Sequence, residues 1–228
     1  MKNNIISLML LFAAFLQFSC SSNDPESDGL PYYQFTQAEA TKLINEPKIG
    51  DEIIYKNQEK ELLKFKVYRS KKGKTTYSTG SFWGSYSNKH FHYDRQELAM
   101  WYAEGYTASG CEITIQKYPI GSNYQTQFPV LGTPKFYGYF TFPLWNGYNG
   151  TDIHNETIAI NFDIPTINMT FNGKTYSKVI KIESHKTEVL NPSNALPFYP
   201  RNVAIIYYDF NYGIIGFDDL NGKLWRLQ

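Results

Sequence analysis

The chain has 228 residues, with 22 Lys and Arg against 21 Asp and Glu, so its formal charge at pH 7 is +1. A near-neutral chain has no overall electrostatic attraction to nucleic acid or to an anionic membrane surface, which excludes both as charge-driven partners. Aromatic residues make up 17% of the chain. Because Tyr and Phe favour half-buried pleated surfaces, this share indicates a β protein rich in cross-strand ring pairs; the alternative is a platform for carbohydrate or peptide.

The N-terminus carries the pattern of an export signal. Its features are, in chain order, Lys2, the apolar run Ile5 to Phe18, Ser19, Cys20 and the acidic stretch 21–28. The apolar run has 14 residues, and a helix needs about 20 to cross a bilayer. We therefore predict a signal peptide over residues 1–19, a lipid on Cys20 and an acidic, flexible tether over residues 20–34. The alternative is an ordinary secretory signal in which Cys20 has no special role.

This segment resembles the signals of Bacteroidota-type lipoproteins, in which a small residue precedes the Cys and an acidic tract follows it. It departs from the usual pattern at Gln17, because Leu is typical there and Leu16 lies one place earlier. The resemblance implies a protein anchored by lipid to the outer membrane and facing outward, so that the anchor makes the membrane a partner. Removal of residues 1–19 takes Lys2 away and leaves 21 basic and 21 acidic residues, so the mature chain is formally neutral.

One helix is predicted, over Thr36 to Asn45. Thr36 and Glu39 have the spacing of a capping box, in which each side chain accepts a hydrogen bond from the other residue's backbone N–H. Pro47 limits the helix beyond Asn45.

From there the sequence alternates between apolar and polar residues, which is typical of antiparallel strands with one solvated face. Two Asn-Gly pairs, Asn172-Gly173 and Asn221-Gly222, predict tight hairpin turns. No second long helix is predicted, which excludes parallel βαβ architecture. We expect a mostly β fold, an antiparallel sandwich or half-open barrel of ten or more strands with one short N-terminal helix, in a single domain over residues 35–228. The predicted strands are Ile53–Lys56, Leu63–Val67, Thr75–Tyr86, Lys89–Tyr93, Leu98–Tyr102, Glu112–Tyr118, Lys135–Phe142, Thr157–Ile164, Ile167–Phe171, Lys174–Glu183, Val203–Asp209 and Lys223–Leu227.

The segment from Phe128 to Gly150 is rich in aromatic residues, Pro and Gly. It is predicted to be a strand with a long loop, and the alternative is a join between two β subdomains. Phe140 and Phe142 alternate and are expected to complete the core. Trp145 and Tyr148 lie beyond Pro143 among Asn and Gly residues, so we expect both rings on a surface turn, where they could bind a sugar or a protein.

Few residues indicate chemistry. His90, His92 and Asp94 share one face of a strand and form a weak candidate set of metal ligands, although no fourth ligand can be named. Cys111 lies in an alternating strand and is expected to be a buried, inert hydrophobe. Asp218-Asp219 beside Asn221-Gly222 is expected to form a turn, because the order of ligands in an EF-hand loop is missing.

The C-terminus also resembles Bacteroidota-type lipoproteins that share no assigned activity. A Tyr-rich strand, Ile205 to Tyr208, is followed by a Gly-led apolar return, Gly213 to Phe217, and then by a Gly-Lys-x-Trp-x-Leu ending at residues 222–227. The resemblance implies architecture and location only.

The sequence contains no nucleophile elbow, no zinc-protease motif and no phosphate-binding loop. We therefore expect a non-catalytic surface module, without cofactor and without nucleic acid, that binds a ligand, a glycan or an envelope protein. Two alternatives stay open: a glycan-acting hydrolase that uses unidentified carboxylates, and a structural subunit of an envelope complex.

Overall fold

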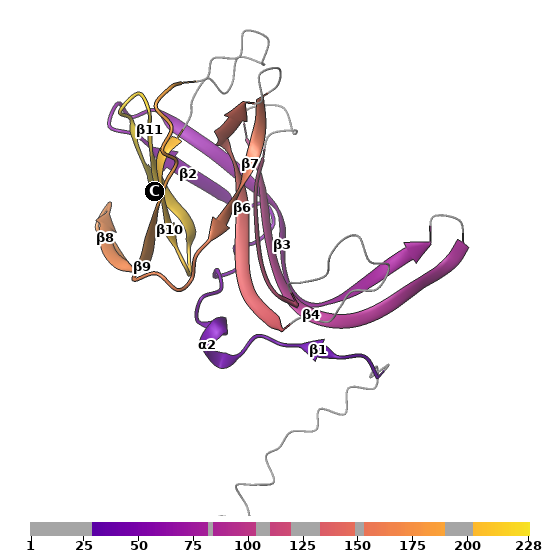
Figure 1. Cartoon of the computed structure of the whole chain (residues 1–228). Coiled ribbons are helices and arrows are strands. Elements are labelled where there is room, and N and C mark those ends of the chain that lie inside the picture. Colours follow the sequence, from indigo (N-terminus) through magenta and orange to yellow (C-terminus); the bar gives the residue numbers. More distant parts are fainter. Residues whose placement is uncertain (1–28, 82–83, 104–109, 120–132, 149–152, 190–202) are drawn as a thin grey trace, which may run out of the picture. The chain divides into compact units, whose positions relative to one another are not determined.

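Strands make up 66% of the computed structural model, and eleven of them form one curled antiparallel sheet, a half-barrel with very little helix (Figure 1). The half-open β architecture predicted from the sequence is therefore confirmed. The structure describes residues 29–81, 84–103, 110–119, 133–148, 153–189 and 203–228. Within them no helix is long and apolar enough to cross a membrane.

The elements are, in chain order, β1 (Tyr32–Tyr33), α2 (Gln37–Ala40), β2 (Glu52–Lys56), β3 (Leu62–Ser81), β4 (Gly84–Tyr102), β5 (Gly110–Pro119), β6 (Pro134–Tyr148), β7 (Ile153–Ile160), β8 (Ile167–Phe171), β9 (Lys174–Glu183), β10 (Val203–Asp209), β11 (Gly213–Asp219) and β12 (Leu224–Leu227).

The sheet consists of two meanders, β2 to β7 and β8 to β12. They are joined where β2, the first strand of one, pairs with β12, the last strand of the other. The order of strands in the sheet is β7-β6-β5-β4-β3-β2-β12-β11-β10-β9-β8. The join is the antiparallel pair β12–β2, in which Arg226 lies opposite Lys56 and Leu227 opposite Tyr55. β7 and β8, which are neighbours in the chain, are thus the two edges of the sheet. Residues Tyr32–Gln228 form one compact unit, and β6 lies inside its sheet, so a join between subdomains at Phe128–Gly150 is not what the structure has.

The long strands β3 and β4 replace four shorter predicted ones. They pair with each other from Phe65 and Tyr102 to Ser81 and Gly84, with register shifts near Tyr68 and Tyr77. Each shift reverses the face on which the following residues lie, so apolar and polar residues do not alternate regularly along the whole strand. For this reason the sequence pattern breaks into short segments, and the predicted strand Thr75–Tyr86 spans the end of β3 at Ser81 and the start of β4 at Gly84.

The N-terminal segment corrects two expectations. The capping box of Thr36 and Glu39 is present, but α2 ends at Ala40. It stops because Ile44 enters the core and the Gln96 side chain bonds its backbone N–H and C=O, at 2.9 and 2.7 Å, which removes both groups from helical pairing. In addition, Tyr32 and Tyr33, predicted to belong to the tether, pair with β4 in parallel.

The two Asn-Gly turns differ. Asn172 and Gly173 both have positive φ, 50° and 77°, which confirms the predicted two-residue turn between β8 and β9. At the second turn only Gly222 has positive φ, of 80°. There the Asp219 carboxylate accepts hydrogen bonds from the backbone N–H groups of Asn221 and Lys223, so an aspartate organises this turn, as expected of a turn rather than of a calcium loop.

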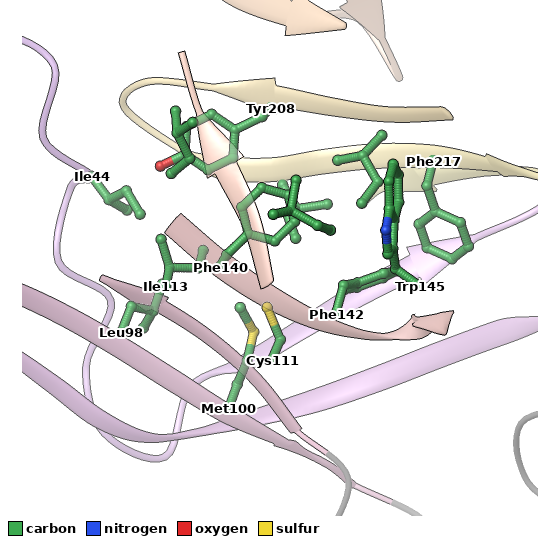
Figure 2. Close-up of a cluster of buried hydrophobic side chains, with 14 of the residues drawn as sticks. Ile44, Leu98, Met100, Cys111, Ile113, Phe140, Phe142, Trp145, Tyr208 and Phe217 are labelled. Atoms are coloured by element: carbon green, nitrogen blue, oxygen red, sulfur yellow. The ribbon is translucent and has the colours of Figure 1, made fainter. Parts of the chain in front are cut away.

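The core lies between the inner faces of the two meanders (Figure 2). Phe140 stacks on Tyr208 with ring centroids 5.8 Å apart, and Phe142 meets Phe217 edge-on at 5.1 Å, so both phenylalanines complete the core as predicted. Cys111 is fully buried among these side chains, and burial raises the pKa of its thiol well above the ordinary value. The predicted burial of Cys111 is confirmed, and a neutral thiol there packs as a small hydrophobe.

Candidate ligand-binding face

Trp145 is not on the surface, and the expectation of an exposed ring there is wrong. Its side chain is 6% exposed and packs in the core beside Phe142 and Phe217 (Figure 2). The pairing of β6 with β7 shifts register between Thr141 and Asn146, which breaks the alternation and lets consecutive residues point inward. The indole Nε1 of Trp145 donates to Glu156 over 3.0 Å, so its one polar group is satisfied inside the protein.

Tyr148, the other predicted ring, is the last residue of β6. Its side chain lies outside the described part of the structure. With Trp145 buried, no observation remains that places a ligand at this end of β6.

His90, His92 and Asp94 do not form a metal site. Nδ1 of His92 lies 2.9 Å from the Thr76 hydroxyl, whereas the Asp94 carboxylate accepts hydrogen bonds from the Tyr32 hydroxyl at 2.6 Å and from the Phe35 backbone N–H at 2.8 Å. Among the described residues, no three His, Cys, Asp or Glu side chains are grouped closely enough to hold a metal ion. Asp94 on this face of β4 instead binds β1 and the segment that follows it through these two hydrogen bonds.

The buried carboxylates of the described residues, Asp209 and Asp219, support turns. Asp209 accepts hydrogen bonds from the backbone N–H groups of Lys178, Asn211 and Tyr212, at 2.8 to 3.2 Å. Both carboxylates therefore serve the loops that join the C-terminal strands.

An exposed aromatic stack lies on the outer face of the sheet, the face turned away from the core. On β4, Leu98 and Met100 point into the core, so Trp101 lies on the outer face, where its side chain is 38% exposed. Tyr68 of β3 stacks on it, with ring centroids 4.0 Å apart and planes inclined by 26°. The guanidinium carbon of Arg69 lies 5.6 Å from the Tyr68 ring centroid, which adds a cation–π contact to the stack.

A β-bulge in β3 adds Arg69 to this stack. Val67 lies opposite Met100 and Arg69 opposite Ala99, so Tyr68 is the extra residue. In a regular strand Tyr68 and Arg69 would point to opposite faces, and the bulge brings both to the outer one.

Two neighbours fix the rings in place. The Tyr68 hydroxyl donates to a Glu112 carboxylate oxygen at 2.8 Å, and both burial and this hydrogen bond raise the pKa of Tyr68. Gly110 leaves room for the indole, because a Cβ there would lie 3.2 Å from Trp101 Cδ1 and 2.8 Å from the Met100 carbonyl oxygen. We call the set Lys66, Tyr68, Arg69, Trp101 and Glu112 the Trp101 face.

The outer face continues over β5 and β6 with polar residues and two more rings. Tyr139 lies in register with Thr114 and Glu97, and Tyr137 with Gln116 and Arg95. The two tyrosine rings are stacked with centroids 6.3 Å apart, and Gln116 donates to the Tyr137 hydroxyl. Rings set among hydrogen-bonding groups are suited to contact with sugars, whose faces are apolar and whose edges carry hydroxyl groups.

The alternation over Leu98 to Tyr102 was sufficient to place Trp101 on the outer face. The alternation of Leu63, Phe65 and Val67 likewise places Tyr68 outward, whereas the outward position of Arg69 was not predictable, because it depends on a bulge that no turn residue marks in the sequence. Comparison with protein-family models, curated proteins and solved structures finds no match to this chain.

Proposed function

We propose that this chain is a surface lipoprotein of the outer membrane, anchored by lipid on Cys20, and that its β domain is a non-catalytic module that binds glycans on the Trp101 face. The N-terminal segment with Cys20 supports the anchor. The stack of Arg69, Tyr68 and Trp101 supports the binding role.

The observation that carries the binding role is the exposure of Trp101 on a polar sheet face. An exposed indole is unfavourable in water, and a protein that only needed a cross-strand pair could bury the ring. Here the indole already stacks on Tyr68 and lies close to the Gly110 backbone before any ligand arrives. A ring that is already fixed loses little conformational freedom on binding, which favours affinity.

The binding role is tested by Trp101→Ala. We expect the purified full chain in detergent to bind at least one polysaccharide from a panel of bacterial, plant and animal glycans, and the substitution to weaken that binding by about fivefold or more, because an anchor ring contributes about 1 kcal/mol or more. Tyr212→Ala is the matched control, since Tyr212 is also an exposed ring, at 43%, but belongs to the turn between β10 and β11. Equal losses in both variants would contradict the assignment of the site.

The anchor is tested by Cys20→Ser. The thioether to lipid needs the Cys20 sulfur, so the variant should incorporate no radiolabelled palmitate and should leave the membrane fraction. A variant that stays labelled would show that the lipid is elsewhere.

A further inference from the structure

The charges of this neutral chain are unevenly distributed. β3 contains Lys64, Lys66, Arg69, Lys71, Lys72 and Lys74 and neither Asp nor Glu. Without residues 1–19 the chain has 21 basic and 21 acidic residues, so this one strand holds a local excess of positive charge that the net value conceals.

The register assigns these cations to faces. Lys66 lies directly opposite Trp101, and Lys71 lies opposite Glu97, so both are on the same side of the sheet as the aromatic stack. Lys72 and Lys74 lie opposite Gln96 and Asp94, on the other side. Directly opposed residues have Cβ atoms about 5 Å apart, so the Lys66 side chain starts within reach of the Trp101 ring.

Three carboxylates of β2, β4 and β5 lie on this side, and two of them have partners: Glu52 of β2 lies directly opposite Lys66 without an ion pair among the described residues, whereas Glu97 and Glu112 are engaged. Glu97 forms an ion pair with Arg95 at 2.6 Å, and Glu112 accepts the hydrogen bond from Tyr68. In the part of the chain that the structure describes, Lys66 and Lys71 form no ion pair, and both are exposed. The guanidinium carbon of Arg69 lies 5.6 Å from the Tyr68 ring centroid, and a guanidinium at this place can bind an anion in a bidentate manner.

We infer that the ligand of the Trp101 face is an acidic polysaccharide, a polymer of sugars that carries carboxylate or sulfate groups. The Trp101 ring stacks on a sugar face, while Lys66, Arg69 and Lys71, which follow one another along β3 beside and beyond it, neutralise anionic groups of the polymer. This inference rests on the proposed function and adds the charge of the ligand to it. Because exposed charges are screened by salt, binding should weaken as ionic strength rises.

The test compares two pairs of substitutions on the same strand. Lys66→Gln with Lys71→Gln removes two charges beside Trp101, and Lys72→Gln with Lys74→Gln removes two charges from the opposite face. The probes are heparin for sulfate, polygalacturonate for carboxylate, dextran as a neutral polymer and duplex DNA as a polyanion without exposed sugar faces. Dissociation constants are measured with the purified full chain in detergent at low and high salt, and unfolding temperatures show that each variant is folded.

We expect heparin or polygalacturonate to bind the wild-type chain. Lys66→Gln with Lys71→Gln should weaken this binding by about tenfold, and Trp101→Ala should weaken it too. Lys72→Gln with Lys74→Gln should change it less than about twofold. Equal losses in the two pairs, or DNA binding as tight as polysaccharide binding and unaffected by Trp101→Ala, would overturn it. Dextran binding as tight as binding of the acidic polymers would overturn the inference but leave glycan binding in place. Failure of every glycan, on this panel and on the broader one, would remove the proposed function itself.

Discussion

Tyr55 and Tyr208 are both buried in the core, but only one of their hydroxyl groups is satisfied. The Tyr55 hydroxyl donates to the Ile214 carbonyl oxygen at 2.8 Å, whereas that of Tyr208 has no hydrogen-bond partner among the described residues. An unsatisfied buried hydroxyl costs free energy, about 1 to 3 kcal/mol, because its hydrogen bonds to water are lost on folding.

Substitution by Phe should therefore act in opposite directions at these two positions. We expect Tyr208→Phe to leave the free energy of unfolding unchanged or to raise it by about 1 kcal/mol, and Tyr55→Phe to lower it by about 1 kcal/mol. Urea denaturation of the two variants measures both values. A clear loss of stability in Tyr208→Phe would show that its hydroxyl has a partner in solution.

Buried tyrosines are expected to limit stability at alkaline pH. Burial raises the pKa of Tyr55 and Tyr208 well above the ordinary value of 10.0, and burial together with the hydrogen bond to Asp218 raises that of Tyr207 to about 12. Because the folded protein holds these protons more tightly than the unfolded chain, their contribution to stability is complete below about pH 10 and decreases as the pH rises above it; the contribution of Tyr207 is lost as the pH reaches about 12.

The urea midpoint should therefore fall between pH 10 and pH 12 more steeply than between pH 8 and pH 10. Tyr207→Phe should reduce the steepness, since it removes one of the groups that titrate. A midpoint that stays constant up to pH 11.5 would contradict the effect of burial on these hydroxyl groups.

At the scale of elements, turns are well predicted by the sequence and bulges are not. Asn172-Gly173 needs only local geometry, so it could be predicted without knowledge of the sheet. The bulge at Tyr68 and the irregular pairing near Trp145 depend on the strands beside them, and the alternation alone placed neither Arg69 nor Trp145 on its correct side. The docking of β1 on β4 likewise depends on Asp94, whose role in the fold is invisible in a local pattern.

The hairpin of β8 and β9 offers a direct test of the turn. Gly173 has a φ of 77°, which a β-branched residue resists, so Gly173→Val should lower the free energy of unfolding by about 1 kcal/mol or more. Gly110→Ala cannot serve as a control for the loss of a glycine. Its Cβ would meet the Met100 carbonyl oxygen, whereas open space surrounds Gly173, so only at Gly173 does the effect report on backbone conformation alone. An unchanged urea midpoint for Gly173→Val would contradict the observed turn.

At the scale of the whole molecule, composition predicted the class of fold but neither its closure nor its charge distribution. The share of aromatic residues and the alternation were enough for a half-open antiparallel fold. The pairing of β12 with β2 joins residues from opposite ends of the chain, and periodicity contains no information on such long-range partners. Net charge indicated no anionic partner, because the basic strand β3 is balanced by acidic residues elsewhere.

Oxidative footprinting of the tryptophans with and without an acidic polysaccharide tests the location of the binding site most directly. In the free full chain, hydroxyl radicals should oxidise Trp101, which is 38% exposed, far more than Trp145 and Trp225, at 6% and 2%, which serve as internal references in the same mass spectrum. Saturating heparin or polygalacturonate should protect Trp101 and leave the oxidation of exposed Tyr212 unchanged. Unchanged oxidation of Trp101 in a sample with bound polysaccharide would contradict binding on this face.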